Sequence, residues 1–329
     1  MKFRLKIPPI AAALALSSVT CTATTILPET GLTTSTYAAG MQHLSTGELD
    51  KAEAAFKESL RSSPNHVAAL VGLADVATLR GDTAQARVYM ERAIALSPDS
   101  ATVQTSWGRY QMLAGDYEAA REAFEKAIAI NPRVAEAHTE LGALYLTRLN
   151  QPRKAIESYK LALVLAPKNL ELHYALSGAL ARTDDITTAT QLLERAAELA
   201  PNEGYPYQLL AVIQASSGLP DEALVSFGKA LDREPLLNEA RWARAELLGS
   251  KGRFDEAIQD YQTLLTNSPN FAPAALMLGL TYQRTNRAKE AEESYLHALS
   301  IDPTLAMAYN NLAYGAAERS ERLDDALQW

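Results

Sequence analysis

The sequence predicts an all-α chain built from repeated helix pairs, and three observations point to that fold class. Alanine, which has the highest helix propensity, accounts for 58 of the 329 residues. Glycine, with 16 copies, and aromatic residues, at 7%, are scarce. Prolines recur every 34 residues over most of the chain, with one interval of 35. A fixed period of this length is typical of folds made from stacked copies of one supersecondary unit.

Residues 1–21 have the pattern of an export signal. Lys2, Arg4 and Lys6 form a basic segment, and an apolar run at 10–16 follows it. This run is about half as long as a membrane-spanning helix, so a signal peptide fits it better than a transmembrane segment does. The alternative is a disordered N-terminus of a cytosolic protein.

Cys21 is the only cysteine of the chain, which excludes a disulfide framework. It follows the apolar run as the lipidated cysteine does in bacterial lipoprotein signals, and we expect it to be the lipid attachment site. Ser18 and Thr20 depart from that pattern, which usually has leucine and a smaller residue there. Cleavage near Ala23 without lipid is therefore the alternative. The threonine-rich residues 22–32 are predicted to form a flexible tether.

Eight prolines end the predicted repeats, and the residues before them follow a helical pattern. The prolines are Pro64, Pro98, Pro132, Pro167, Pro201, Pro235, Pro269 and Pro303. An alanine stands twelve residues before each proline, a bulky apolar residue eight before it, and a small or aliphatic residue five before it. The bulky residues are Phe56, Met90, Phe124, Tyr159, Leu193, Phe227, Tyr261 and Tyr295. Positions with this spacing lie on one helix face, so we expect a second helix to pack closely there.

The helix that precedes this one in each pair carries a small residue near its middle, such as Gly108. Between the two helices stands a turn that often contains glycine, such as Gly115, which suits the left-handed conformation that closes a helix. The 35-residue repeat spans 135–169, and we expect its extra residue in the turn at 149–152. Pro152 then falls near the start of a second helix, where proline is tolerated.

Two helices per 34 residues with this small–large–small pattern resemble the tetratricopeptide repeat family over residues 33–329. The resemblance implies a right-handed solenoid of helix-turn-helix units, with eight full repeats. A ninth repeat begins at Ala306 and stops at Trp329, early in its second helix. Because a solenoid normally ends with a polar capping element, we expect that the natural chain continues past Trp329 or that this end is frayed.

The sequence favours neither catalysis nor a cofactor. Its five histidines do not form a zinc-binding H-E-x-x-H motif, and no phosphate-binding loop or G-x-S-x-G motif occurs. The net charge of −8 argues against a nucleic-acid partner. It also gives no attraction to anionic lipids, so any membrane attachment would come from lipid on Cys21. The carboxylates, as at Glu118 and Glu122, are interpreted as solvated helix faces. We therefore predict no enzyme activity, no cofactor and no metal site.

The resemblance implies that the first helix of each pair lines a groove that binds a protein or peptide. The basic cluster with which some family members bind a C-terminal carboxylate is missing, since only Arg109 and Arg284 are basic among the groove positions. The candidate binding residues cluster in repeats five to seven and are Tyr174, Tyr205, Gln208, Trp242 and Glu246. Aromatic rings there suit an apolar or extended peptide. The alternative is that some of these rings pack against neighbouring helices, as we expect of Trp107, which is assigned to the core.

The export signal and the repeats together resemble envelope proteins that help to assemble pili or to export exopolysaccharide. We therefore expect a non-catalytic adaptor that is exported to the periplasm or faces it from the outer membrane. Two alternatives stay open: the repeats are the regulatory part of a longer enzyme whose catalytic domain lies beyond Trp329, or the protein is a soluble periplasmic scaffold without lipid. The sequence does not name the partner.

Overall fold

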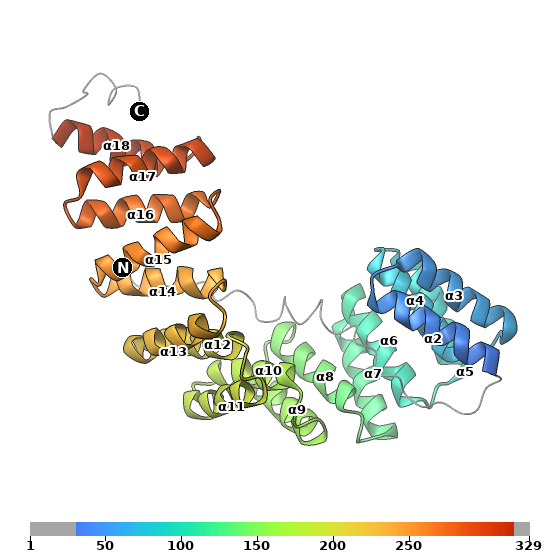
Figure 1. Cartoon of the computed structure of the whole chain (residues 1–329). Helices are drawn as coiled ribbons and strands as arrows, with labels where there is room; N and C mark the ends of the chain where they lie inside the picture. Colours follow the sequence, from blue (N-terminus) through green and yellow to red (C-terminus); the bar gives the residue numbers. More distant parts are fainter. Residues whose placement is uncertain (1–30, 319–329) are drawn as a thin grey trace. The chain divides into compact units, whose positions relative to one another are not determined.

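A computed structural model describes residues 31–318, and this part of the chain is helical with no strand (Figure 1). The helices are α2 (Gly31–Ser45), α3 (Leu49–Ser62), α4 (Val67–Leu79), α5 (Thr83–Leu96), α6 (Ala101–Ala114), α7 (Tyr117–Ile130), α8 (Ala135–Thr147), α9 (Pro152–Leu165), α10 (Leu170–Ala181), α11 (Ile186–Leu199), α12 (Tyr205–Ser216), α13 (Pro220–Arg233), α14 (Asn238–Ser250), α15 (Phe254–Asn267), α16 (Ala272–Arg284), α17 (Ala288–Ile301) and α18 (Ala306–Glu318). They make eight pairs and the first helix of a ninth, so the all-α prediction is confirmed.

The predicted signal peptide, Cys21 and most of the predicted tether lie outside the described residues. Helix α2 begins at Gly31, two residues before the predicted start of the repeats at residue 33. At the other end, α18 supplies the first helix of the ninth repeat. The end of that repeat, at 319–329, lies outside the described residues as well.

The chain divides into two compact units, and the division falls between Leu192 and Leu193, inside α11. In residues 31–192, the first helices of successive pairs contact one another from α2 through α4, α6 and α8 to α10. We call the face that these first helices share the inner face. In residues 193–318, each helix from α12 to α18 packs against the next one along the chain, and Figure 1 shows α14 to α18 stacked in this way.

The small–large–small pattern forms the contact between the two helices of a pair. Phe124 of α7 is fully buried, and its ring lies so close to Gly108 of α6 that a β-carbon there would come within 2.5 Å of it. Ala120, one turn before Phe124, has no exposed surface. Trp107 is a correction to the sequence interpretation. It is only half-buried and stacks on Tyr110, with 5.3 Å between the ring centroids.

The turns between paired helices contain one residue with a positive φ. Glycine occupies this position in five turns, and Gly115 with φ 86° is typical. Asn150, Asp184 and Asn286 occupy it in the other three, and these are residue types that tolerate the left-handed region. Asn150 lies in the longer turn, between the end of α8 and the start of α9 at Pro152. The expected place of the extra residue is therefore confirmed.

Candidate protein-interaction surface

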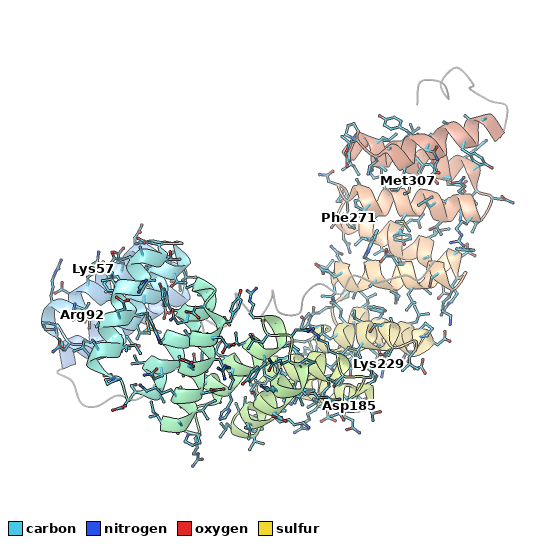
Figure 2. The ribbon with its side chains drawn as sticks, turned by 180° about the vertical axis from the view of Figure 1, so that it is seen from behind. Lys57, Arg92, Asp185, Lys229, Phe271 and Met307 are labelled. Carbon is cyan, nitrogen blue, oxygen red and sulfur yellow. The ribbon has the colours of Figure 1, made fainter. Side chains whose placement is uncertain are left out.

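Trp242 is the central residue of the predicted binding surface, and it lies on α14. Its ring is half-buried and meets two other rings edge-on: Tyr261 at 5.7 Å and Phe271 at 5.3 Å between centroids. Phe271, labelled in Figure 2, lies directly before α16 and is itself about one third exposed. Trp242 thus packs against its neighbours and still keeps part of its ring at the surface.

Glu246 lies one helical turn after Trp242, and the indole N–H of Trp242 donates a hydrogen bond to its carboxylate. Burial raises the pKa of Glu246, and the hydrogen bond from Trp242 opposes that shift. The two predicted residues therefore form a half-buried polar pair. Such a pair presents a fixed carboxylate next to an aromatic ring, which suits a ligand with both donors and apolar surface.

Gln208 of α12 has a buried side-chain oxygen, Oε1, that accepts no hydrogen bond from residues 31–318. A buried acceptor without a donor is unfavourable, and a ligand that brings an N–H group would satisfy it. Tyr205, the first residue of the same helix, is half-buried. Both belong to the unit that contains Trp242 and Glu246.

Tyr174 differs from the other four predicted residues. It lies on α10, in the unit formed by residues 31–192, and only 9% of it is exposed. This burial favours the alternative interpretation for Tyr174, in which the ring packs inside the protein. Of the predicted set, the structure brings Trp242 and Glu246 into direct contact.

A second group of residues lies on the inner face of residues 31–192, and the sequence analysis named only its arginine, Arg109, as a groove position. Arg109 of α6 forms an ion pair with Glu136 of α8 at 2.9 Å, and its guanidinium also donates to Ser106 Oγ at 3.2 Å. The charges of Arg109 and Glu136 also act on the carboxyl groups of Asp75 on α4 and Glu140 on α8. We call Asp75, Arg109, Glu136 and Glu140 the inner acidic cluster.

Two carboxyl groups of the inner acidic cluster have raised pKa values. Burial is the main cause, and it raises the pKa of Asp75 to about 6 and that of Glu140 to about 7. The positive charge of Arg109 opposes each shift, and the negative charge of Glu136 adds to it. Near neutral pH, each of these carboxyl groups is therefore present in both its protonated and its ionised form.

The sequence did carry a signal for this cluster, although a weak one. Asp75 and Arg109 stand 34 residues apart, at the same position of adjacent repeats, and Glu136 and Glu140 are separated by one helical turn. Equivalent positions of successive repeats point the same way, so opposite charges at this position predict contact.

Among residues 31–318, no three histidine, cysteine or acidic side chains lie close enough together to hold a metal ion. Over the same range, no helix is long and apolar enough to cross a membrane.

Family models and related proteins agree on the repeat. A family model described as tetratricopeptide repeat matches residues 37–101, 143–204 and 209–272, and a second model with that description matches 250–312. A model described as TPR repeat matches 108–148. Human protein O-mannosyl-transferase TMTC1 is 26% identical over 192 residues, which cover 57% of this chain but only 21% of that protein. The chain therefore spans about one fifth of the length of this relative.

Two solved structures share the fold. The C-terminal part of a TPR repeat-containing protein from Cytophaga hutchinsonii superposes with a TM-score of 0.61 and 16% identity, over 74% of this chain and 99% of that one. A tetratricopeptide repeat protein from Parabacteroides merdae gives a TM-score of 0.52 and 16% identity, over 77% of this chain and 99% of that one.

Proposed function

Because the chain belongs to the tetratricopeptide repeat family, we propose that it is a non-catalytic protein-interaction scaffold of the bacterial cell envelope. Within that setting, its role is that of an adaptor in a secretion, pilus or exopolysaccharide assembly system. The export-signal pattern of residues 1–21 supports the location. The helix pairs of the chain support the class of function. In a solenoid the helix pairs pack against one another, and the side chains that do not take part in this packing form surfaces that can bind a partner.

The observation that carries the proposal is the polar and aromatic surface around Trp242. A half-buried ring, a carboxylate fixed by that ring and the unpaired Oε1 of Gln208 occur on neighbouring repeats of one unit. An extended peptide would supply apolar side chains to the ring and backbone N–H groups to the two acceptors. This combination suits recognition of a polypeptide better than recognition of a small metabolite.

Site-specific photo-crosslinking in the native envelope tests the proposal. A photoreactive residue is placed at position 212, a partly exposed position on the helix of Gln208, and a matched one at the exposed position Glu122 on α7. We expect a discrete protein adduct from position 212 and none from position 122. The adduct is identified by mass spectrometry, which also names the partner. Equal or absent labelling from the two positions would contradict binding at this surface.

A second function has one observation in its favour. The similarity to protein O-mannosyl-transferase TMTC1 covers 57% of this chain and a small part of that enzyme. This is the pattern expected if tetratricopeptide repeats form the regulatory part of a longer enzyme. The length of the natural open reading frame separates the two proposals, because a catalytic domain encoded after Trp329 supports the enzyme and a stop codon shortly after the ninth repeat supports the adaptor.

A further inference from the structure

The inner acidic cluster is a charged site in the unit formed by residues 31–192. The predicted peptide surface around Trp242 belongs to the other unit. The members of the cluster come from three first helices in succession, and α6, which carries Arg109, contacts both α4 and α8. Three carboxyl groups face one guanidinium, so the cluster holds excess negative charge when its acids are ionised. Arg109 already pairs with Glu136, and the excess therefore falls on Asp75 and Glu140.

We propose that the inner acidic cluster binds a lysine or arginine side chain from a basic segment of a polypeptide partner. The inference rests on the proposed function as a protein-interaction scaffold, and it adds the chemistry of the partner. It places the recognition of charge on α4, α6 and α8, in the unit formed by residues 31–192.

Asp75 and Glu140 form no hydrogen bond or ion pair within residues 31–318, although Asp75 is partly buried and only 7% of Glu140 is exposed. Their carboxyl oxygens are not among the fully buried atoms without a partner, so a ligand can reach them. An ionised carboxylate that is largely buried is unfavourable without a positive charge or donor beside it. An ammonium or guanidinium group carries several N–H donors and a positive charge, so it supplies these carboxylates with both hydrogen bonds and a counter-charge.

Tyr159 of α9 is 1% exposed, and its ring lies against Gly142 on α8. Its hydroxyl has no hydrogen-bond partner within residues 31–318, and the negative charge of Glu140 helps to raise its pKa. The hydroxyl therefore lies within electrostatic range of Glu140. The buried, unpaired hydroxyl of Tyr159 is therefore electrostatically coupled to the Glu140 carboxyl group.

A long organic cation fits this cluster better than a metal ion does. A metal ion needs several ligands at short distance from one point, and no such group of three acidic, cysteine or histidine side chains occurs in residues 31–318. The acids of the cluster are instead spread over α4 and α8 with Arg109 between them. A long cationic side chain can reach into such an arrangement while the rest of its peptide stays on the inner face.

The pKa values support the same conclusion. Asp75 and Glu140 hold protons at acidic pH because burial raises their pKa values to about 6 and about 7. A bound cation favours the ionised form, so binding releases protons and tightens as pH rises. The titratable and charged groups that face this place are Asp75, Arg109, Glu136, Glu140 and Tyr159.

Fluorescence anisotropy with two short labelled peptides tests the proposal on the full chain. The peptides have the same Ala/Ser backbone, and one carries three lysines where the other carries three glutamines. The test variant combines Asp75→Asn with Glu140→Gln. Its matched control combines Glu118→Gln with Glu122→Gln on the exposed face of α7, which removes the same number of carboxyl groups. Circular dichroism confirms that both variants stay helical.

We expect the wild type and the control variant to prefer the lysine peptide, and the test variant to lose about tenfold in affinity for it. The preference should also grow between about pH 5 and about pH 8 in the wild type and not in the test variant. Equal binding of the two peptides by the wild type would overturn the proposal. So would an equal loss in the test and control variants, which would indicate general attraction by net charge.

The outcome is separable from that of the proposed function. A crosslinked partner at position 212 together with no lysine preference would leave the scaffold intact and remove only the assignment of charge recognition. Lysine binding with no crosslinked partner would support charge recognition by the inner acidic cluster and would contradict binding at the surface around Trp242.

Discussion

Trp242 is the residue at which packing and the proposed binding are most closely combined, since its ring contacts Tyr261 and Phe271 and its N–H bonds to Glu246. We expect Trp242→Ala to weaken binding of the crosslinked partner by about 2 kcal/mol, or some thirtyfold, as truncation of an aromatic anchor does. Titration of the purified partner measures the change.

Two further variants control for folding at this position. Trp242→Phe keeps the edge-on ring contacts and loses only the N–H, so it should bind more weakly than the wild type and better than Trp242→Ala. Glu122→Ala, on the exposed face of α7, should bind like the wild type. If the partner binds Trp242→Ala as tightly as the wild type, then the ring belongs to the core and the binding surface lies elsewhere.

Glu140 makes the stability of the protein depend on pH in a direction opposite to that of a salt-bridged acid. Its pKa is raised from 4.5 to about 7 in the folded protein, so between these values the folded state holds more protons than the unfolded state. Stability therefore falls as pH rises from about 4.5 to about 7 and is level above that range. The charges of Arg109 and Glu136 act on Glu140, and both residues remain in the Glu140→Gln variant.

Glu140→Gln should remove this dependence, because glutamine stays neutral. We expect the variant to be more stable than the wild type by about 1–3 kcal/mol at pH 8 and equal to it at pH 4, as judged from urea unfolding followed by circular dichroism. A variant that is less stable at pH 8 would show that the ionised carboxylate has a partner that holds it in place.

These residues differ in how far the sequence could predict them. Trp242 and Glu246 stand four apart on one helix, so their contact follows from helical spacing alone. Arg109 pairs with Glu136 on the next repeat, and its charge also acts on Asp75 and Glu140. These interactions join three repeats, so they depend on how closely α4, α6 and α8 approach one another. Carboxylates are usually solvated, and only the burial of Glu140 distinguishes it from Glu122.

At the scale of the helix pair, Asp260 joins α14 to α15. This buried carboxylate accepts two hydrogen bonds from Arg244, at 2.6 and 2.7 Å, and a third from Arg241 at 3.4 Å. Asp260→Ala would leave the two guanidinium groups without a counterion, and we expect a loss of about 2–4 kcal/mol in the free energy of unfolding. Asp221→Ala removes an exposed partner of Lys251 instead and should lose less than about 1 kcal/mol. Similar losses in the two variants would mean that Asp260 contributes no more than a surface pair.

The close contact between α6 and α7 gives a second test at this scale. Ala120 is fully buried where the two helices meet, so Ala120→Leu should overpack the contact and destabilise the protein by about 1–3 kcal/mol. Ala129→Leu makes the same change at an exposed position of α7 and should have little effect. The melting temperatures of the two variants decide the matter, and an unchanged value for Ala120→Leu would show that the contact can relax around the larger side chain.

The helix pairs were predictable because one period governs them all, whereas part of the turn chemistry was not. Glycine marks five turns, but Asn150, Asp184 and Asn286 take the same left-handed conformation. Asparagine and aspartate are common in many surface settings, so their presence alone does not indicate a positive φ.

For the molecule as a whole, the order of eight helix pairs and a ninth first helix follows from the sequence, but the division inside α11 does not. Ala189, Leu193 and Ala196 continue the small–large–small pattern through that helix and are buried as in the other repeats. The period is therefore unbroken at the position where the contacts separate into two units.

We propose that Cys21, which lies outside the described residues, is lipidated and attaches the protein to a membrane. If its thiol is the acyl acceptor at the end of the apolar run, the wild type, expressed in a bacterial host, is expected to incorporate labelled palmitate and to partition into detergent. Cys21→Ala should do neither, since the acidic chain has no attraction of its own to anionic lipid.

Mass spectrometry of the mature N-terminus separates this outcome from export without lipid. A lipidated protein begins at Cys21 with the added mass of its acyl chains, and two or more chains are needed for a stable anchor. A mature protein that begins at Thr24 without lipid would show that Ser18 and Thr20 prevent recognition as a lipoprotein signal. The protein would then be a soluble periplasmic scaffold, and its inner face and the surface around Trp242 would be free to meet partners away from the membrane.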